Sequence, residues 1–209
     1  MVSVSGFYKR FKHPIELTIQ DEVAPREIPP NNVDNAFLVG VEFEFRKNFN
    51  FIHRSLDKVF LIANTSFIKS QTQYTEEQYQ ALLNNARPNE VVSKNRVMFG
   101  QSPFLINTSL GYDNNGTSII LSYNIQGKRL VGLGIGRVPN IYEQPFHDLK
   151  FKISQNFGSE DQFNLSFSAS NLIDDDRLRL YEIYNGESGT FAQTRAGKGF
   201  SLGFSYSFN

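Results

Sequence analysis

The carboxylates Glu42 and Glu44 have the type and spacing that acid–base chemistry requires. On a strand they share one face about 7 Å apart, which is near the separation of the carboxyl groups in a glycosidase. Arg46 follows on the same face. A glycosidase also needs a cleft around the pair, and the surrounding residues predict only a regular strand. We therefore interpret Glu42, Glu44 and Arg46 as charged side chains that line a water-filled lumen. No enzymatic activity is predicted.

Three other groups of residues could hold a phosphate or a metal ion. The glycine cluster 132–136 resembles a phosphate-binding loop, but Pro139 and no helical pattern follow it, so a loop or a strand bend is predicted. The three histidines are far apart and the chain has no cysteine, which leaves no zinc-binding pattern. The aspartates 174–176 predict a solvated turn rather than a calcium site. No metal and no cofactor are therefore predicted.

Composition excludes several further classes of protein. Lys plus Arg and Asp plus Glu both number 21, so no excess positive charge points to a nucleic-acid partner. No run of about 18 apolar residues predicts a membrane-spanning helix. The first ten residues lack the pattern of a signal peptide and instead resemble part of a β-strand. We expect the chain to be a fragment of a longer protein.

The strongest pattern is the strict alternation at the end of the chain. Phe200, Leu202, Phe204, Tyr206 and Phe208 alternate with serine and glycine. One face of this strand is aromatic and aliphatic, and the other is small and polar. Such alternation at a chain end is typical of the closing strand of a membrane β-barrel.

Seven further segments show the same two-residue period. Lys150 and Lys152 lie on the polar side of one of them, so we expect these two lysines to face the lumen. In segment 58–70 both faces of the strand would carry apolar residues, so the sequence does not show which face is the apolar one. Phe60, Ile62 and Ile68 lie on one face, and Leu61, Ala63 and Phe67 lie on the other. The segments are 2–12 (with 15–19 beyond Pro14), 37–46, 58–70, 104–112, 119–123, 149–154 and 163–170.

The connections between these strands alternate between long and short. The long ones are 21–33, 71–98, 126–147 and 171–198, and the short ones are 48–57, 113–116 and 158–162. Within 71–98, a capping-box pattern at 75–78 predicts a short helix that ends before Pro88. Outer-membrane barrels sort their loops in this way, with short periplasmic turns and long extracellular loops. The sequence therefore predicts an all-β, antiparallel transmembrane β-barrel segment of about eight strands.

Six segments, in this order, resemble the C-terminal part of a TonB-dependent outer-membrane receptor, of the large kind that includes SusC-like nutrient importers. They are 6–16, 40–46, 100–107, 139–145, 170–175 and 200–208. The resemblance implies that residues 1–209 form the last third of a barrel of roughly 22 strands. The plug domain, the TonB box and the signal peptide of such a receptor have no counterpart here.

The resemblance also implies a function for the parent protein. That function is nutrient uptake across the bacterial outer membrane, driven through the TonB complex and aided by a surface lipoprotein. The fragment alone is not expected to transport, and its nutrient is not identified. The terminal strand would face lipid and be recognised by the barrel-assembly machinery. Two alternatives remain open: a complete eight-stranded barrel with a structural or adhesion role, and a soluble β-sandwich that binds carbohydrate.

Overall fold

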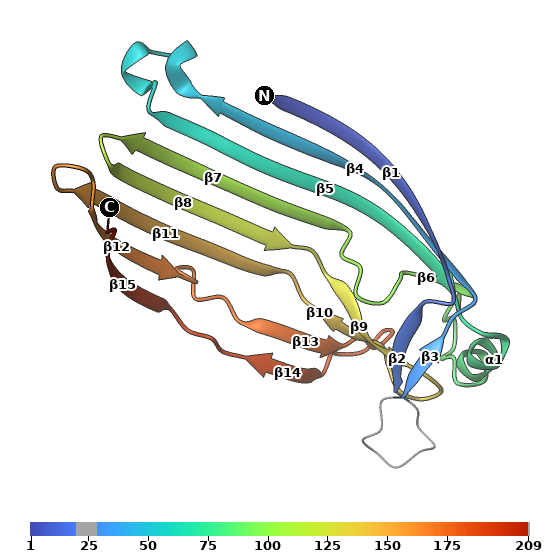
Figure 1. Ribbon diagram of the computed structural model, residues 1–209. Helices are drawn as coiled ribbons and strands as arrows, with labels where there is room; N and C mark the ends of the chain where they lie inside the picture. Colours follow the sequence, from blue (N-terminus) through green and yellow to red (C-terminus); the bar gives the residue numbers. More distant parts are fainter. Residues whose placement is uncertain (20–28, 209) are drawn as a thin grey trace.

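Eight strands form one antiparallel sheet in the computed structural model, which describes residues 1–19 and 29–208. Each strand pairs with the next long strand along the chain, and the sheet curves strongly (Figure 1). The predicted all-β, antiparallel class is confirmed. The predicted connection 21–33 lies largely outside the described residues. The strands are β1 (Val2–Lys12), β4 (Asn35–Asn48), β5 (Val59–Gln73), β7 (Phe104–Asn114), β8 (Thr117–Gln126), β11 (Phe146–Phe157), β12 (Phe163–Ser170) and β15 (Gly199–Tyr206).

The pairing register gives this sheet one apolar face and one polar face. Residues directly opposite each other in an antiparallel pair lie on the same side of the sheet. On the polar face, Ser109 pairs with Ser122 and Ser122 pairs with Lys150. On the apolar face, one row across five strands consists of Tyr112, Ile119, Ile153, Phe167 and Leu202. Many large side chains of the apolar face are exposed, and Leu202 is 74% exposed.

The register also decides the orientation of β5, which the sequence left open. Ala63 pairs with Phe45, and Phe67 pairs with Val41, so Ala63 and Phe67 belong to the apolar face. Phe60 therefore lies on the polar face, where it pairs with Gly111. A Cβ atom on Gly111 would come within 2.1 Å of the Phe60 ring. The ring occupies the space that a side chain at position 111 would need.

The strands are staggered as well as paired. Val41, in the middle of β4, pairs with Phe67, and Phe67 pairs with Phe104, the first residue of β7. Such a stagger accompanies the tilt of strands in a barrel wall. β4 and β5 have 14 and 15 residues, more than the roughly 9–11 that cross a bilayer. These two strands therefore extend beyond a membrane-thick band.

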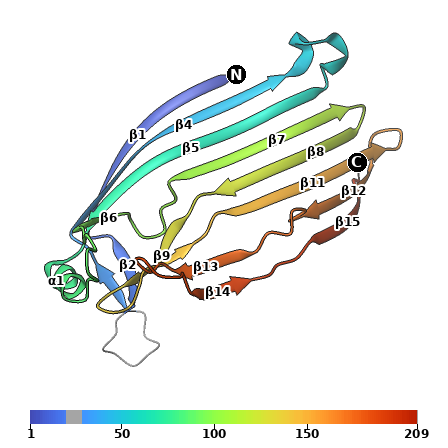
Figure 2. The same cartoon turned by 180° about the vertical axis from the view of Figure 1, so that it is seen from behind.

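Connections of different length lie at opposite ends of the sheet. At one end are the turns at 115–116 and 158–162 and the segment 49–58, which contains η1 (Phe49–Phe51) and η2 (Arg54–Leu56). Both chain ends lie there too (Figure 2). The long connections lie at the other end, which we call the loop end. Among the connections that the structure describes, the predicted sorting is confirmed (Figure 1).

The loop end contains a second sheet and the helix. β2 pairs with β9 in parallel, and the other strands of this sheet pair antiparallel. Helix α1 (Glu76–Asn84) begins with the predicted capping box, in which Thr75 and Gln78 exchange hydrogen bonds. No helix among the described residues is long and apolar enough to cross a membrane. The second sheet consists of β2 (Ile15–Ile19), β3 (Pro30–Asn32), β9 (Arg129–Gly134), β10 (Ile141–Glu143), β13 (Arg177–Tyr181) and β14 (Thr190–Thr194), and β6 (Asn95–Arg96) pairs with β5.

Candidate functional site

The four long connections pack into one unit at the loop end. Tyr74, from the second connection, packs against Leu130 and Leu133 of the third. Leu130 and Leu133 are fully buried, whereas the middle of the large sheet exposes both faces. β2 of the first connection continues this packing by pairing with β9. The cluster of buried apolar residues therefore lies among the long connections at the loop end.

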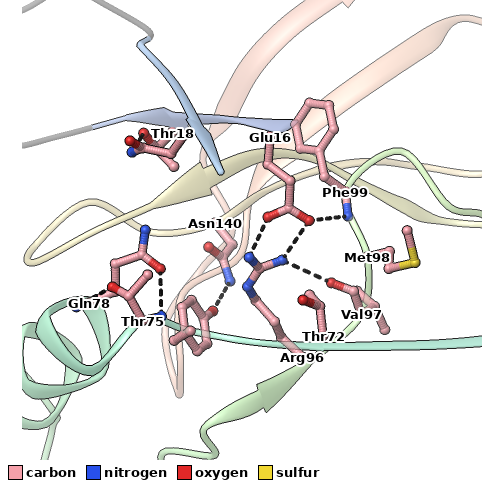
Figure 3. Close-up of polar contacts among 12 residues, drawn as sticks. Glu16, Thr18, Thr72, Thr75, Gln78, Arg96, Val97, Met98, Phe99 and Asn140 are labelled. Atoms are coloured by element: carbon pink, nitrogen blue, oxygen red, sulfur yellow. Dashed lines mark hydrogen bonds and ion pairs between the residues drawn. The ribbon is translucent and has the colours of Figure 1, made fainter. Parts of the chain in front are cut away.

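A buried ion pair joins the first and second long connections. Glu16 of β2 and Arg96 of β6 are each at least nine-tenths buried, with side-chain exposures of 3% and 5%. The carboxylate accepts hydrogen bonds from both terminal nitrogens of Arg96 and from the Phe99 backbone N–H (Figure 3). The guanidinium lies 5.0 Å from the ring centroid of Tyr74. Glu16 and Arg96 therefore fasten two segments that are 80 residues apart in the sequence.

A second buried carboxylate joins the third and fourth connections. Glu143 of β10 is 3% exposed and accepts from Arg129 Nη2 at 2.7 Å and from Arg179 Nε at 3.0 Å. Arg177 lies 3.9 Å away. Burial raises the pKa of the Glu143 carboxyl, but the hydrogen bonds and charges of Arg129 and Arg179 outweigh burial, so the pKa is lowered. Glu143 is therefore held as a carboxylate.

This arrangement predicts a loop end that loosens in acid. Because the pKa of Glu143 is lower in the folded chain, its contribution to stability is complete above about pH 4.5, the ordinary value. That contribution is lost as the pH falls through the folded pKa. We expect the protection factors of the amides in β10 and β13, corrected for the intrinsic exchange rate at each pH, to fall over this range. Glu143→Gln should exchange faster at neutral pH and show no such acid transition. An unchanged pH profile in this variant would contradict the assignment to Glu143.

Two open depressions flank the turn after β9. One has a volume of about 630 Å³ and contains Tyr74, Asn140 and Tyr142, and the other has about 710 Å³ and contains Asn31 and Gln78. Arg137 lines both. Amide, hydroxyl and guanidinium groups at such a surface suit a polar, oxygen-rich ligand.

Tyr142 is the most perturbed phenol at this surface. Burial raises its pKa to about 12, and the nearby Glu182 carboxylate acts in the same direction. Lys128 Nζ lies 4.5 Å from the centre of the Tyr142 ring. Tyr142 is therefore a neutral hydroxyl at every physiological pH, available as a hydrogen-bonding group rather than as a base.

The lysines and acids singled out in the sequence share one face but do not form one site. Glu42, Glu44 and Arg46 lie side by side on the polar face of β4, with Ser66 and Asn64 opposite the two carboxylates. Lys150 and Lys152 lie on the same face of β11, four strands away in the sheet. Four strand spacings are roughly 19 Å. The five residues are therefore charges distributed over a wide polar surface.

The residues of the terminal strand lie together on the opposite, apolar face. Phe200, Leu202 and Phe204 are 66%, 74% and 64% exposed, and Tyr206 and Phe208 are exposed as well. Phe163 lies between β11 and β15, with its ring centroid 5.4 Å from Phe157 and 4.9 Å from Tyr206. These rings gather at the short-turn end of the sheet, as an interfacial aromatic girdle would.

The other motifs have structural roles. Gly132 and Gly134 belong to β9, and a Cβ atom on Gly134 would come within 2.1 Å of the Val138 carbonyl oxygen. The glycine cluster therefore forms a strand and a tight bend, as predicted. Residues 174–176 follow a turn at 172–173, and Asp175 accepts from the His147 backbone N–H at 2.7 Å. Among residues 1–19 and 29–208, no three His, Cys, Asp or Glu side chains come together as metal ligands.

A curved antiparallel sheet with one apolar face, one polar face and packed loops at one end is the wall of an outer-membrane-type β-barrel. A solved structure with this fold is the ferric citrate transporter FecA in its unliganded form, with a TM-score of 0.64 and 12% sequence identity. The similarity covers 98% of this chain and 28% of FecA. No protein-family model and no curated protein matches the sequence. The comparison therefore supports the barrel-wall fold, and this chain spans a little over a quarter of its structural neighbour.

Proposed function

We propose that this chain is part of the barrel wall of a TonB-dependent outer-membrane receptor that imports a nutrient. The observation that carries the proposal is the exposed, largely apolar face of the eight-stranded sheet, which lies opposite a polar face. In water such a face is an aggregation hazard, whereas in a bilayer it is the required surface. The similarity to the ferric citrate transporter FecA supports the same reading. In this role the long connections are extracellular and the short turns periplasmic.

Each group of predicted residues then has a place in the receptor. Glu42, Glu44, Arg46, Lys150 and Lys152 line the polar lumen. The apolar residues of β15 contact outer-membrane lipid and, before insertion, the barrel-assembly machinery. The role is not enzymatic, and the depressions beside Arg137 contribute to nutrient binding. The TonB complex, and a surface lipoprotein if the parent uses one, act on the whole receptor.

The edges of the sheet require further strands. β1 and β15 are its two edges, and within the described residues they do not pair with each other. A bilayer cannot solvate unpaired backbone groups, so each edge must be hydrogen-bonded. We propose that additional strands of the parent receptor supply these partners. The alternative, a complete eight-stranded barrel, requires β1 to pair with β15, and engineered cysteines on these two strands would then cross-link within one chain.

Membrane insertion is the direct test of this function. When the parent receptor that contains this chain is expressed with an export signal, so that β1 and β15 have partner strands, we expect it to sediment with outer membranes and to migrate differently on gels before and after heating. Folded barrels resist detergent until they are heated, whereas an ordinary soluble sheet does not. A soluble, monodisperse product would overturn the proposal and favour a carbohydrate-binding sandwich.

A further inference from the structure

Two asparagines of the chain are followed directly by a glycine and lie in turns. Asn115–Gly116 connects β7 to β8 at the short-turn end, and Asn185–Gly186 lies in the connection between β13 and β14 at the loop end. Both asparagines have a left-handed backbone, with a φ of 48°. The side-chain amide of an asparagine before glycine is open to attack by the next backbone nitrogen, because glycine has no Cβ atom to shield it. The two turns share this chemistry and differ in how firmly they are held.

The turn at Asn115–Gly116 is fixed by its neighbours. The flanking residues Asn114 and Thr117 are paired with each other in the large sheet. The Gly116 carbonyl oxygen accepts from the Asn156 backbone N–H at 2.8 Å, and a Cβ atom on Gly116 would come within 3.1 Å of the Asn156 carbonyl oxygen. This turn therefore opens only when its contacts with β11 break.

The turn at Asn185–Gly186 is held more weakly. β13 ends at Tyr181 and β14 begins at Thr190, so the turn lies outside both strands. The Gly186 backbone N–H donates to the Ile183 carbonyl oxygen at 3.3 Å, which is a long hydrogen bond. Both residues of the turn are exposed. The nitrogen of Gly186 is therefore released more often than that of Gly116.

Arg87, from the second long connection, lies against this turn. Its Nη1 atom donates to the Tyr184 carbonyl oxygen at 2.6 Å and would lie 3.3 Å from a Cβ atom on Gly186. The ion pairs found among residues 1–19 and 29–208 do not involve Arg87. Position 185 lies between the two contacted residues, so a carboxylate there would be within reach of this guanidinium. Arg87 and Tyr184 also line the depression that contains Tyr142.

We propose that Asn185 is a site of spontaneous deamidation, which adds a negative charge beside Arg87. The Gly186 backbone nitrogen attacks Cγ of Asn185 and gives its proton to water. The bond between Cγ and the side-chain nitrogen breaks, and this nitrogen leaves as ammonia with a proton taken from water. A second water molecule opens the cyclic imide at either carbonyl, which gives aspartate or isoaspartate. Either product carries one carboxylate where the chain had a neutral amide.

The new carboxylate is expected to pair with Arg87. The pair would join the second long connection to the fourth, next to the depression that Arg87 and Tyr184 line. An exposed ion pair of this kind slows local opening by roughly two- to fivefold. Deamidation would thus tighten the loop end as the molecule ages. An effect on nutrient entry rests on the proposed function, whereas deamidation itself depends on the turn alone.

The test follows both asparagines in the same molecule. The parent receptor is incubated in lipid vesicles at mildly alkaline pH, and peptide mass spectrometry measures deamidation at each asparagine over time. We expect Asn185 to react roughly tenfold faster than Asn115, because its turn opens more often. Gly186→Ala should slow the reaction at Asn185 several-fold, since its methyl group shields the attacking nitrogen. The matched control Gly189→Ala changes the same connection but not the attacking residue, and should leave the rate unchanged.

Asn185→Asp tests the consequence of the new charge. Hydrogen exchange in residues 86–90 should slow by roughly two- to fivefold in this variant, and adding Arg87→Gln should remove the difference. Unchanged exchange would overturn the pairing with Arg87. Equal rates at Asn185 and Asn115 would overturn the modification site. Gel mobility before and after heating reports insertion separately, so an inserted receptor with equal rates contradicts this proposal and leaves the proposed function standing.

Discussion

Arg96→Leu is expected to release the first long connection from the second and to lower the local stability of the loop end by about 3–5 kcal/mol. The reason is the burial of its partner. Glu16 is only 3% exposed, and without Arg96 its carboxylate keeps one hydrogen bond, from the Phe99 backbone N–H. An uncompensated charge at such a site costs far more than the ion pair contributes. Denaturant-dependent hydrogen exchange should show faster opening of residues 15–19 and 95–99.

The double variant Glu16→Met/Arg96→Leu separates the cost of a lone charge from the loss of packing. Replacing both partners by apolar side chains of similar size is often neutral or stabilising. Here the ion pair is imperfect, because Arg96 Nε is the one buried side-chain nitrogen or oxygen among the described residues that lacks a hydrogen-bond partner. We expect the double variant to recover most of the lost stability. A double variant as unstable as Arg96→Leu would show that the shape of the pair, rather than its charge, holds the connections together.

The large sheet could be predicted from the sequence because its signals are local. Alternation in residues 199–208 follows from the geometry of one strand, and the lengths of the connections follow from the chain itself. The apolar side of β5 could not be predicted, since Phe60 and Phe67 have the same chemistry and opposite parity. Only the pairing of Phe67 with Val41, and the glycine opposite Phe60, decide between the two sides.

The loop end could not be predicted because its contacts are long-range. Glu16 has no sequence feature that distinguishes it from an exposed acid, and its partner Arg96 is 80 residues away. Glu143 binds arginines from two different connections, which no local pattern indicates. The parallel pairing of β2 with β9 also has no local signal in the sequence. A charged residue that alternates with apolar ones, as Glu16 does between Ile15 and Leu17, was the available hint. That pattern predicts a strand with one polar side, but not that this side is buried.

The orientation of the large sheet in a bilayer leads to the last prediction, Leu110→Arg. Leu110 lies near the middle of β7 on the apolar face, in one row with Leu61 and Leu121, and is 45% exposed. In a membrane its side chain would lie deep in hydrocarbon, where an arginine costs about 2–4 kcal/mol. In water the same substitution at a half-exposed position would change stability by less than about 0.5 kcal/mol. Urea titration of the parent receptor in lipid vesicles, followed by circular dichroism, measures the difference.

Ser109→Arg is the matched control, because Ser109 is the adjacent residue and lies on the polar face. Its hydroxyl shares a 2.8 Å hydrogen bond with Ser122, so the substitution should cost no more than about 1 kcal/mol. An arginine at position 109 should therefore be tolerated, whereas an arginine at position 110 should be strongly destabilising. This difference is expected only if one face of the sheet is in lipid. A similar small cost for both arginines would place both faces in water and remove the basis for a barrel wall.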